Sequence, residues 1–355
     1  MNLAALTRIV VCVVSLISAT VIATSGAVAS NAPSAGPLTV CHAGSLLAAF
    51  VQVEKAFTVL HPDVTLKDVS GGSVSLARRL ATGRAPCDVY ASADYLDIDQ
   101  LLKPAKLADY TVLFASGRMV LAYLATDAKA MRLPVTGDFN PPASIPEVAP
   151  NWYQTLLAPG VLIGGAHPFL DPGGYRSHLI FELAQAFYKA PDLYNSLLEH
   201  YTVIPPDSTN PAGAPALGKE FSFQFSYEHS AAATAKRSSS YRYARLPDRI
   251  DLSTVDNDRS YAQASVTIPG LGLPGSKPSA SIPGSRAAWG LTVLKNSPNQ
   301  ESATSFVDLV LGPVGAAALK ANGPTPISPA IVSAGDYAHL PKSTQALVTT
   351  KQGSR

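Results

Sequence analysis

The sequence carries little charge and has no long run of basic residues. Lys and Arg number 27 against 25 Asp and Glu, so the net charge is only +2 at neutral pH. Nucleic-acid binding relies on many cations facing phosphates, so we expect no nucleic-acid partner. Internal repeats and low-complexity tracts are also absent, and this argues against a stalk-like surface protein. The 355 residues are 47% hydrophobic, enough for two globular lobes with cores of their own.

Sequence motifs of common enzyme classes are missing as well. The chain has no G-x-x-x-x-G-K-[ST], no H-E-x-x-H and no G-x-S-x-G. An exported hydrolase using Asp171 with His167 or His42 is an alternative, but no nucleophile, base and orienting group stand at a plausible spacing. The two histidines are better explained as loop residues at a cleft rim than as a zinc pair. We therefore expect a binding protein rather than an enzyme.

Cysteine is scarce, with three residues in the whole chain. Cys12 lies in an apolar N-terminal segment, which leaves Cys41 and Cys87 to form a bridge. Cys41 comes late in a short apolar stretch, 37–43, and Cys87 opens another, 87–93. If these stretches are parallel neighbouring strands, the two residues lie about 13 Å apart along the strands, too far for a disulfide. We expect two buried free thiols, although export permits disulfides.

The first thirty residues differ in kind from the rest. Arg8 precedes an apolar run, IVVCVVSLISATVIA at 9–23, and the small residues GAVAS follow. This order is typical of a secretory signal peptide covering 1–29, with cleavage after Ala29. The alternative is an uncleaved membrane anchor, but the run is short for a span of about 20 residues. We expect an exported, periplasmic protein.

From residue 37 onward, apolar strands alternate with segments of helical periodicity. Leu46, Phe50, Val53 and Phe57 recur at helical spacing, for example. This rhythm predicts an α/β fold in which mostly parallel sheets are flanked by helices on both faces. The expected strands are 37–43, 63–70, 87–93, 116–125, 160–166 and 286–297, the helices 45–62, 73–84, 94–107, 174–190, 193–203 and 299–323, and the loops 204–220 and 252–285, with a polar tail after 340 that wraps the outside.

Three small-residue loops fall between a strand and a helix: HAGSLL (42–47), SGGSVS (70–75) and DPGGYRS (171–177). Open α/β sheets bind ligands at the carboxyl ends of strands, where helix N-termini offer unpaired N–H groups and a positive dipole end. Ser45 and Ser73 add hydroxyl groups, so the three loops together would form an oxyanion site of neutral donors. For any single loop, an ordinary N-cap is the competing interpretation, and Ser45 is well placed to cap its helix.

Asp171 stands directly before the two glycines of the third loop. A carboxylate beside an anion repels it or takes up a proton, so Asp171 either caps the helix or approaches a ligand whose central atom accepts oxygen. Asp94 is expected to act as a cap. Arg78, Arg79 and Arg176 follow the loops, and we interpret them as surface or lobe-stabilising charges, with contact between Arg176 and the ligand as the alternative.

Five segments occur in an order that resembles one family: HAGSLLAAF, GGSVSLARRLATGRAPCDVYASADY, MVLAYL, NWYQTLLAPGVLIGGAHPFLDPGGYRS and LPDRIDLS. They are similar to the extracellular solute-binding proteins for molybdate and tungstate that feed ABC importers, in the archaeal-type tungstate/molybdate branch. The likeness runs from about residue 38 to 355. It implies a two-lobed periplasmic-binding-protein fold (type II), with lobe 1 at 37–118 plus 287–355 and lobe 2 at 119–286.

The resemblance also implies which residues hold the ligand. Ser45 and Ser73 match serines that donate through a hydroxyl group or a loop N–H, and Gly173 matches a backbone N–H donor. Asp171 matches a carboxylate that approaches the metal centre of the oxyanion in this branch. A glutamate of the second lobe joins it there, and the tetrahedral anion expands toward six ligands.

That glutamate belongs to a pattern resembling Phe-Glu-Tyr-Lys-Ser, for which this chain has FSYEHS. If Tyr227 takes the tyrosine position, Ser226 replaces the glutamate. If Ser230 anchors the match, Tyr227 falls on the glutamate position and Glu228 on the tyrosine. A shift of one residue in a strand turns the side chain to the other face. The expected ligands here are Tyr227, as a phenol donor, and Glu228, as a second carboxylate for the metal centre.

The function implied by the resemblance is non-enzymatic. The protein would capture molybdate or tungstate between its lobes, close about a hinge and deliver the anion to an ABC transporter permease. RMVLAYLA and RAAWGLTVL are the expected hinge crossings. We expect no cofactor, a monomer, and the oxyanion and the permease as partners, with sulfate or another oxyanion as the alternative ligand.

Overall fold

The computed structural model describes residues 37–84, 86–204, 216–274 and 276–351. The expected signal peptide at 1–29 lies outside the described residues, as does most of the loop expected at 204–220. In the described part of the chain, no single helix is long and apolar enough to cross a membrane. Only α9 (Gln300–Leu311) and α10 (Pro313–Asn322), bent by 59° at their junction, pass that test as a pair.

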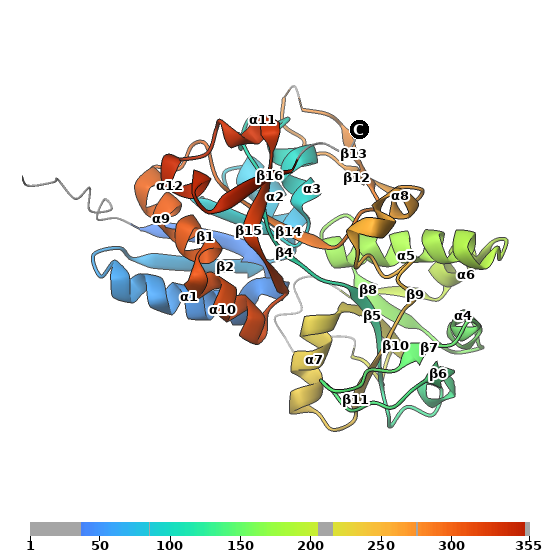
Figure 1. The fold of residues 1–355 in the computed structure, drawn as a ribbon. Coiled ribbons are helices and arrows are strands. Elements are labelled where there is room, and N and C mark those ends of the chain that lie inside the picture. Colours follow the sequence, from blue (N-terminus) through green and yellow to red (C-terminus); the bar gives the residue numbers. More distant parts are fainter. Residues whose placement is uncertain (1–36, 85, 205–215, 275, 352–355) are drawn as a thin grey trace, which may run out of the picture. The chain divides into compact units, whose positions relative to one another are not determined.

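Two large sheets form the framework of the described residues (Figure 1). The first sheet has the order β16-β15-β4-β14-β3-β1-β2, and the second has the order β6-β7-β11-β5-β10-β8-β9. The first-sheet strands are β1 (Leu38–Ala43), β2 (Leu66–Gly71), β3 (Val89–Ser92), β4 (Val112–Ser116), β14 (Ala288–Val293), β15 (Thr325–Ser333) and β16 (Val348–Lys351). The second-sheet strands are β5 (Met119–Leu124), β6 (Val135–Thr136), β7 (Glu147–Val148), β8 (Ile163–Ala166), β9 (Tyr201–Ile204), β10 (Phe223–Tyr227) and β11 (Tyr241–Arg245).

Helices connect and cover these strands. The helices besides α9 and α10 are α1 (Leu47–Leu60), α2 (Ser73–Ala81), α3 (Tyr95–Asp97), α4 (Trp152–Leu156), α5 (Pro172–Tyr188), α6 (Leu193–Glu199), α7 (Glu228–Arg237), α8 (Asp258–Tyr261), α11 (Ala334–Tyr337) and α12 (Lys342–Gln345). A separate hairpin pairs β12 (Ser265–Pro269) with β13 (Ser279–Pro283). The alternation of strands and helices expected from the sequence is confirmed.

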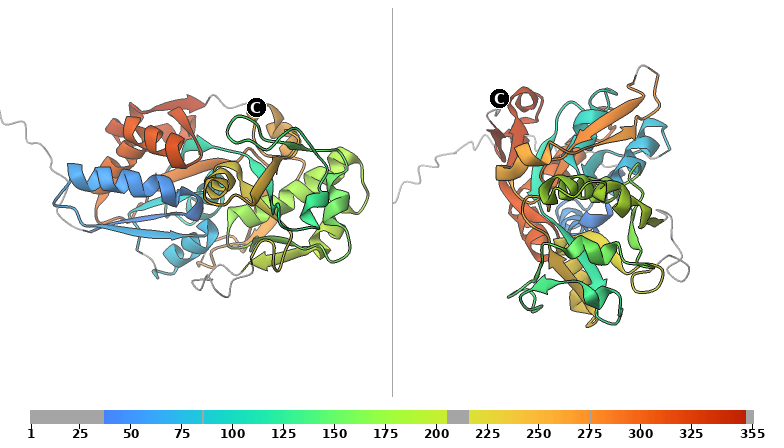
Figure 2. Two further views of the ribbon diagram at one scale, coloured as in Figure 1. Left: turned by 90° about the horizontal axis from the view of Figure 1, so that it is seen from below. Right: turned by 90° about the vertical axis from the view of Figure 1, so that its right-hand side faces the viewer.

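Helix α1 illustrates how the hydrophobic pattern builds the core. It buries Phe50, Val53 and Phe57 on one face, and Phe57 meets Phe306 of α9 edge to face with ring centroids 5.4 Å apart. Aromatic pairs of this kind contribute about 0.5–1.5 kcal/mol beyond their burial. The views from the front and from below show α1 beside the C-terminal helices, and α1 contacts α9 and α10 (Figures 1 and 2).

The chain passes between the sheets in two places. Gly117 and Arg118 lead from β4 into β5, and the return path runs through the hairpin β12–β13 to β14. Gly117 N donates a hydrogen bond to Ala287 O at 2.9 Å, which ties the two crossing segments together. These segments are the expected hinge crossings, and the lobe boundaries at 118/119 and 286/287 stay a prediction.

Four expectations about secondary structure need correction. The helix expected at 193–203 ends at Glu199, and Tyr201–Ile204 form the strand β9 instead. The sheets are mixed, because β14 runs antiparallel to β3 and β4, and β5 runs antiparallel to β10 and β11. Strand β14 returns from the second sheet rather than from a helical crossover, so nothing constrains it to be parallel. The loop expected at 252–285 contains the hairpin β12–β13, which buries alternate residues. The tail after 340 adds β16 as an edge strand.

Cys41 and Cys87 form a disulfide with Cα atoms 5.8 Å apart, so the expectation of two free thiols is wrong. Strands β1 and β3 are parallel neighbours as assumed. However, β3 begins only at Val89, and the chain bends at Asp88. Asp88 N donates to Thr39 O at 2.8 Å, and Asp88 Oδ2 accepts from Thr39 N at 2.7 Å. The bend interrupts the straight strand on which the separation of about 13 Å depended, and it brings Cys87 beside Cys41.

Loss of this disulfide should destabilise the protein. The two cysteines are 46 residues apart, and closing a loop of that length in the unfolded chain corresponds to about 4 kcal/mol in the chain-entropy model. We expect the double variant Cys41→Ser, Cys87→Ser to lose roughly 2–4 kcal/mol of unfolding free energy in urea. Reduction by dithiothreitol should lower the unfolding free energy of the wild type by a similar amount and leave that of the double variant unchanged. Two reactive thiols in the unreduced mature protein would contradict the bridge.

Candidate ligand-binding site

A cavity of about 410 Å³ lies where loops of the first sheet meet loops of the second. The first sheet contributes the loop after β1, the turn before α2 and the residue after β3. The second sheet contributes the start of β5, the ends of β8 and β10, and the first turns of α5 and α7. The lining residues are Ala43, Gly44, Ser45, Gly71, Gly72, Ala93, Met119, Ala166, Asp171, Gly173, Gln224, Phe225, Ser226, Tyr227 and Ser230.

Four helical segments begin at this cavity: the turn Gly44–Leu46 that leads into α1, and the helices α2, α5 and α7. The first turn of each presents N–H groups without intrahelical partners and a positive dipole end. A Cβ atom at Gly72 would lie 2.7 Å from Leu170 O, and Ser75 N donates to that oxygen at 3.0 Å. Position 72 therefore requires glycine, and this close approach aligns the starts of α2 and α5.

Ser45 and Ser73 both accept hydrogen bonds from protein donors. Ser45 Oγ accepts from Trp289 Nε1, and Ser73 Oγ accepts from Ala93 N, each at 3.0 Å. Each hydroxyl hydrogen is therefore left to donate to another acceptor. Ser45 lines the cavity, whereas Ser73 is fully buried behind Gly72. The cap expected from Ser45 is wrong, because a 3-10 turn precedes α1 and no side chain caps either segment.

Asp171 is the N-cap of α5 and also lines the cavity. Its Oδ1 accepts from Gly173 N at 2.7 Å, so the capping interpretation is confirmed. The N–H that Gly173 was expected to offer a ligand is donated to Asp171 in this structure. Burial raises the pKa of Asp171, although the Gly173 N–H and the Arg176 guanidinium act in the opposite direction.

Tyr227 reaches the cavity from the end of β10. Its hydroxyl oxygen accepts from Arg176 Nη1 at 2.8 Å, which leaves the phenolic hydrogen free to donate. Burial raises the pKa of Tyr227 far above its usual range, although Arg176 opposes the shift. Tyr227 is therefore a neutral donor.

Glu228 is not brought together with the other expected ligands. Its Oε1 accepts from Arg245 Nε at 2.8 Å, and its Oε2 lies 3.5 Å from Arg118 Nε. The residue opens α7 and lines a different cavity of about 390 Å³. At the end of β10, Ser226 and Tyr227 both line the candidate site.

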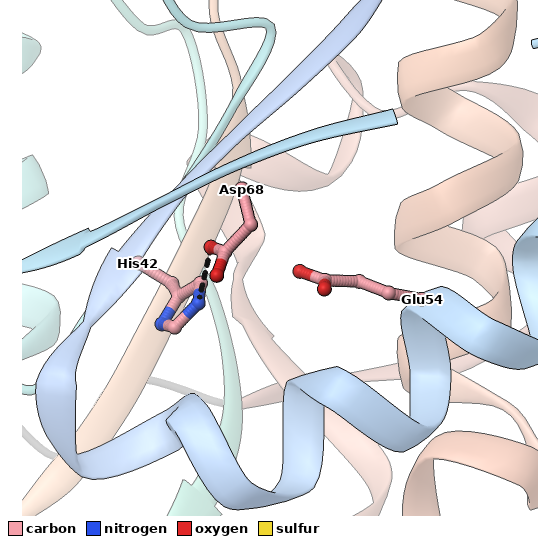
Figure 3. Close-up of side chains that lie close together, drawn as sticks. All are labelled: His42, Glu54 and Asp68. Carbon is pink, nitrogen blue, oxygen red and sulfur yellow. Dashed lines mark ion pairs between the residues drawn. The ribbon is translucent and has the colours of Figure 1, made fainter. Parts of the chain in front are cut away.

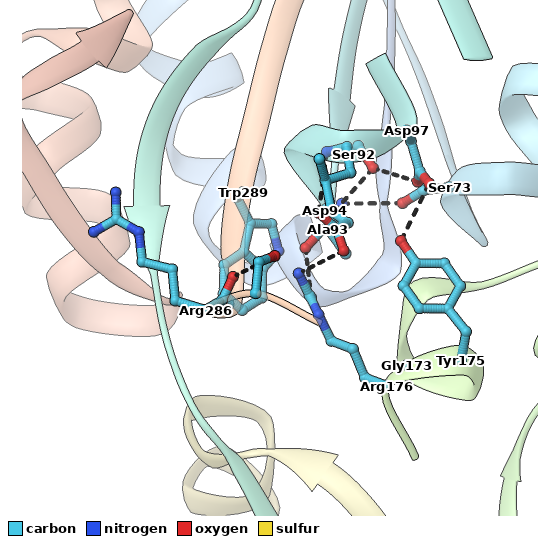
Figure 4. Close-up of polar contacts among 12 residues, drawn as sticks. Ser73, Ser92, Ala93, Asp94, Asp97, Gly173, Tyr175, Arg176, Arg286 and Trp289 are labelled. Atoms are coloured by element: carbon cyan, nitrogen blue, oxygen red, sulfur yellow. Dashed lines mark hydrogen bonds and ion pairs between the residues drawn. The ribbon is translucent and has the colours of Figure 1, made fainter. Parts of the chain in front are cut away.

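Arg176 lies behind the cavity and is only 1% exposed. From α5, its Nη1 donates to Ala93 O at 2.6 Å, and its Nη2 lies 3.1 Å from Asp94 Oδ2 (Figure 4). Burial lowers the pKa of Arg176, but Asp94 and two nearby tyrosines shift it above the usual range. Burial raises the pKa of Asp94 more than Arg176 lowers it, and the carboxyl group lies as counter-ion 3.1 Å from a guanidinium that keeps its proton. Arg176 is not a surface charge but a buried cation with its own counter-ion.

Asp94 has the capping role expected from the sequence. Its Oδ1 accepts from Leu96 N at 3.0 Å at the start of α3. The bond leaves Oδ2 for Arg176, so one carboxylate both ends the loop after β3 and neutralises the buried cation.

A second buried carboxyl group, Asp97, lies one turn further along the same segment. Ser92 Oγ donates to its Oδ2 at 2.7 Å, and Tyr175 OH donates to its Oδ1 at 3.2 Å (Figure 4). Burial, with a smaller contribution from Asp94, raises the pKa of Asp97 to about 8. Asp97 is therefore mostly protonated at neutral pH and adds little negative charge behind the cavity.

Several residues of the site were not predicted from the sequence. Trp289, one of two tryptophans in the chain, is fully buried and stacks edge to face on Tyr227 with centroids 4.8 Å apart. Ser226 and Ser230 flank the displaced glutamate in FSYEHS and line the cavity. Their hydroxyl groups are the signal that could have identified them, since Ser45 and Ser73 were expected as donors on the same ground.

Comparisons with known proteins define the class. Residues 38–324 match the family described as bacterial extracellular solute-binding protein, and the chain belongs to that family. Its members are binding proteins rather than enzymes, and they act outside the cytoplasm.

Individual relatives cover most of the chain. Two uncharacterized solute-binding proteins, from Petrotoga mobilis and Methanoculleus marisnigri, are each 30% identical; the matches cover 83% and 88% of this chain and 85% and 87% of theirs. A molybdate/tungstate-binding protein of Thermococcus kodakarensis is 27% identical, with 96% of each chain covered.

Solved structures support the fold. The sulfate-binding protein SubI of Mycobacterium tuberculosis H37Rv superposes with a TM-score of 0.56 at 17% identity, covering 89% of this chain and 94% of that one. The periplasmic binding protein AfuA of Actinobacillus pleuropneumoniae, with fructose-6-phosphate bound, gives 0.51 at 14% identity, covering 81% and 83%. The two-lobed periplasmic-binding-protein fold is confirmed, with mixed sheets.

The protonated state of Asp97 predicts a pH dependence. In the unfolded chain the carboxyl group loses its proton near its usual pKa of 3.8, whereas the folded protein keeps it until about pH 8. The stabilisation is therefore present at low pH and is lost as the pH rises from about 4 to about 8. Asp97→Asn preserves the neutral hydrogen bonds without titrating. We expect the stability of the wild type relative to Asp97→Asn to fall by a few kcal/mol, roughly 2–5, over this range.

Urea denaturation of both proteins between pH 5 and pH 9 measures this difference. Parallel profiles for the wild type and the variant would show that Asp97 does not hold a proton in the folded state.

Proposed function

We propose that this protein captures a tetrahedral metal oxyanion, molybdate or tungstate, and delivers it to the permease of an ABC transporter. The observation that carries the proposal is the convergence of four helix starts and several hydroxyl groups on one cavity that also contains a single carboxylate. The similarity to a molybdate/tungstate-binding protein along 96% of the chain supports the same ligand class.

Neutral donors are suited to a buried dianion. Helix N-termini and loop N–H groups supply partial positive charge without a full cation. Arg176, the nearest cation, is already paired with Asp94 at 3.1 Å. The ligand would therefore be held by dipoles from Ser45, Tyr227 and the first turns of the helices.

The hydrogen bond from Gly173 N to Asp171 Oδ1 suggests how the carboxylate takes part in oxyanion binding. When an oxyanion oxygen accepts the N–H of Gly173, Asp171 Oδ1 loses its hydrogen bond and is released toward the cavity. Molybdenum(VI) and tungsten(VI) can accept a further oxygen ligand, whereas sulfur and phosphorus in sulfate and phosphate do not expand in this way. Asp171 would then contribute to selectivity as well as to binding.

The position of Glu228 leaves one carboxylate at the site instead of two. Ser226 lines the cavity next to Tyr227, which corresponds to the alignment in which serine replaces the glutamate. A hydroxyl group at this position donates a hydrogen bond to an oxyanion oxygen rather than ligating the metal. We propose a coordination number below six for the bound metal centre.

The same substitution makes sulfate the second candidate ligand. With Ser226 in place of a carboxylate, the cavity carries less negative charge, and sulfate needs only neutral donors. Under this alternative Asp171 remains a helix cap that repels the anion weakly.

The cavity is larger than the proposed ligand. A tetrahedral oxyanion occupies roughly 100 Å³, on the scale of 30 Å³ per water molecule, against about 410 Å³ of cavity. We propose that the lobes move about the crossings near Gly117 and Ala287 to enclose it. The exported protein, after cleavage at Ala29, would act as a periplasmic monomer without a cofactor.

Thermal unfolding of the mature chain, residues 30–355, with molybdate, tungstate, sulfate or phosphate tests the proposed ligand. A ligand at a 100-fold excess over Kd adds about 2.7 kcal/mol of stability, which raises Tm by several degrees. We expect this shift with molybdate or tungstate and little or none with phosphate. A shift with sulfate alone would select the second candidate, and no shift with any of the four would contradict oxyanion binding.

Substitution of Asp171 tests its role at the metal centre. Asp171→Asn keeps a capping side chain but removes the charge, and Asp171→Ala removes both. We expect each variant to fold and to bind molybdate or tungstate roughly tenfold or more weakly, about 1.4 kcal/mol or more, in isothermal titration. Glu228→Gln is the matched control and should bind normally. Unchanged affinity in both Asp171 variants would restrict this residue to capping.

A further inference from the structure

Three side chains of types that bind metal ions lie close together at the edge of the first sheet, outside the oxyanion cavity. His42 lies on β1, Asp68 on the edge strand β2, and Glu54 on α1, which packs over both strands (Figure 3). His42 Nε2 and one carboxylate oxygen from each acid all lie within 4.8 Å of one another. Neither the disulfide nor the ligand cavity uses any of these side chains.

The histidine is oriented as a metal ligand requires. His42 is fully buried, and its Nδ1 lies 2.8 Å from Ala43 O. A carbonyl only accepts, so Nδ1 carries a proton and donates it to Ala43 O, which leaves Nε2 to face the cluster. A second-sphere bond to a backbone carbonyl is the usual means of fixing a metal-binding histidine.

Nε2 itself is not satisfied within the protein. Asp68 Oδ1 approaches it to 2.7 Å, yet it lies off the direction of a ring N–H, and Nε2 has no hydrogen-bond partner among the described residues. Nε2 and Asp68 Oδ1 therefore lie close together without a hydrogen bond between them, so both atoms are available to a cation.

Glu54 adds a second acceptor without a donor. Its Oε1 is buried and has no hydrogen-bond partner in the described part of the chain, which is unfavourable for a buried acceptor. Its carboxylate lies within 4.8 Å of the ligand atoms of His42 and Asp68, so a divalent cation would supply the missing partner and relieve the repulsion between the two acids. The side chain of Asp68 is 32% exposed and gives solvent access to the cluster.

We propose that His42, Glu54 and Asp68 bind one divalent first-row transition-metal ion, with Zn²⁺ as the best fit. One imidazole nitrogen and two carboxylate oxygens match zinc, which accepts three protein ligands and leaves a fourth position to water. Mg²⁺ and Ca²⁺ prefer ligand sets of oxygen alone. Zinc bonds of 2.0–2.2 Å place ligand atoms roughly 3.4 Å apart, which requires only small movements of the two acidic side chains.

The site joins three elements next to the oxyanion cavity. Ala43, whose carbonyl holds His42, lines that cavity. Binding of the metal would fix the end of β1, the edge strand β2 and α1 relative to one another. It would therefore stabilise the first lobe whether or not an oxyanion is bound.

Titration of Zn²⁺ into the chelator-treated mature protein, produced without a histidine tag, tests the site. We expect one Zn²⁺ per chain by isothermal titration, a rise in Tm and visible absorption bands on substitution with Co²⁺, but no binding of Mg²⁺. Glu54→Gln and Asp68→Asn keep the side-chain shapes and should weaken Zn²⁺ binding roughly tenfold or more. Asp63→Asn changes an exposed acid of the same α1–β2 connection and should bind like the wild type.

Three outcomes would overturn the proposal. The first is an absence of Zn²⁺ binding at concentrations up to about 1 mM. The second is equal affinity in the wild type, Glu54→Gln and Asp68→Asn, which would locate the metal elsewhere. The third is a loss of stability in the two variants that is the same with and without Zn²⁺, which would reduce the cluster to internal polar packing.

Discussion

A buried guanidinium from the second lobe reaches into the first. Arg176 extends from α5 to Ala93 and Asp94 after β3, and the same side chain contacts Tyr227 at the end of β10. Removing one partner of a buried ion pair costs about 3–5 kcal/mol, because the other charge is left without compensation. The start of α5, which carries Asp171, is thus held against the loops of the first sheet.

This pair also sets the electrostatics of the cavity. Asp94 neutralises Arg176, and a pKa of about 8 keeps Asp97 mostly protonated. On the other side of β10, Glu228 is matched by Arg118 and Arg245. The strong charges around the site are compensated locally, so a ligand meets mainly N–H and O–H dipoles together with Asp171.

The parts of the fold with a clear local pattern could be predicted from the sequence. The periodic apolar residues of α1 and the small-residue loops before α2 and α5 appear where expected, because helix spacing and capping depend on neighbours in the chain. Strand direction in the mixed sheets could not be predicted, since the partners of β5 (β10 and β11) and of β14 (β3 and β4) are distant in the sequence.

The predictions for single residues that were wrong or ambiguous also have specific physical causes. A bend at Asp88 brought Cys87 beside Cys41, and no motif marks such a bend. Glu228 was ambiguous because a shift of one residue exchanges the two sides of β10. Burial of Arg176 depends on contacts with residues 51 and 83 positions away, which residue type does not reveal.

The most direct test of the oxyanion site is a crystal structure of the mature protein with molybdate, using the anomalous signal at the molybdenum absorption edge. We expect one strong peak in the cavity bounded by Ser45, Gly72 and Tyr227, with an Asp171 oxygen turned from Gly173 toward the metal. A cavity without a peak, or a bound anion with Asp171 still bonded to Gly173 and directed away from molybdenum, would contradict this account.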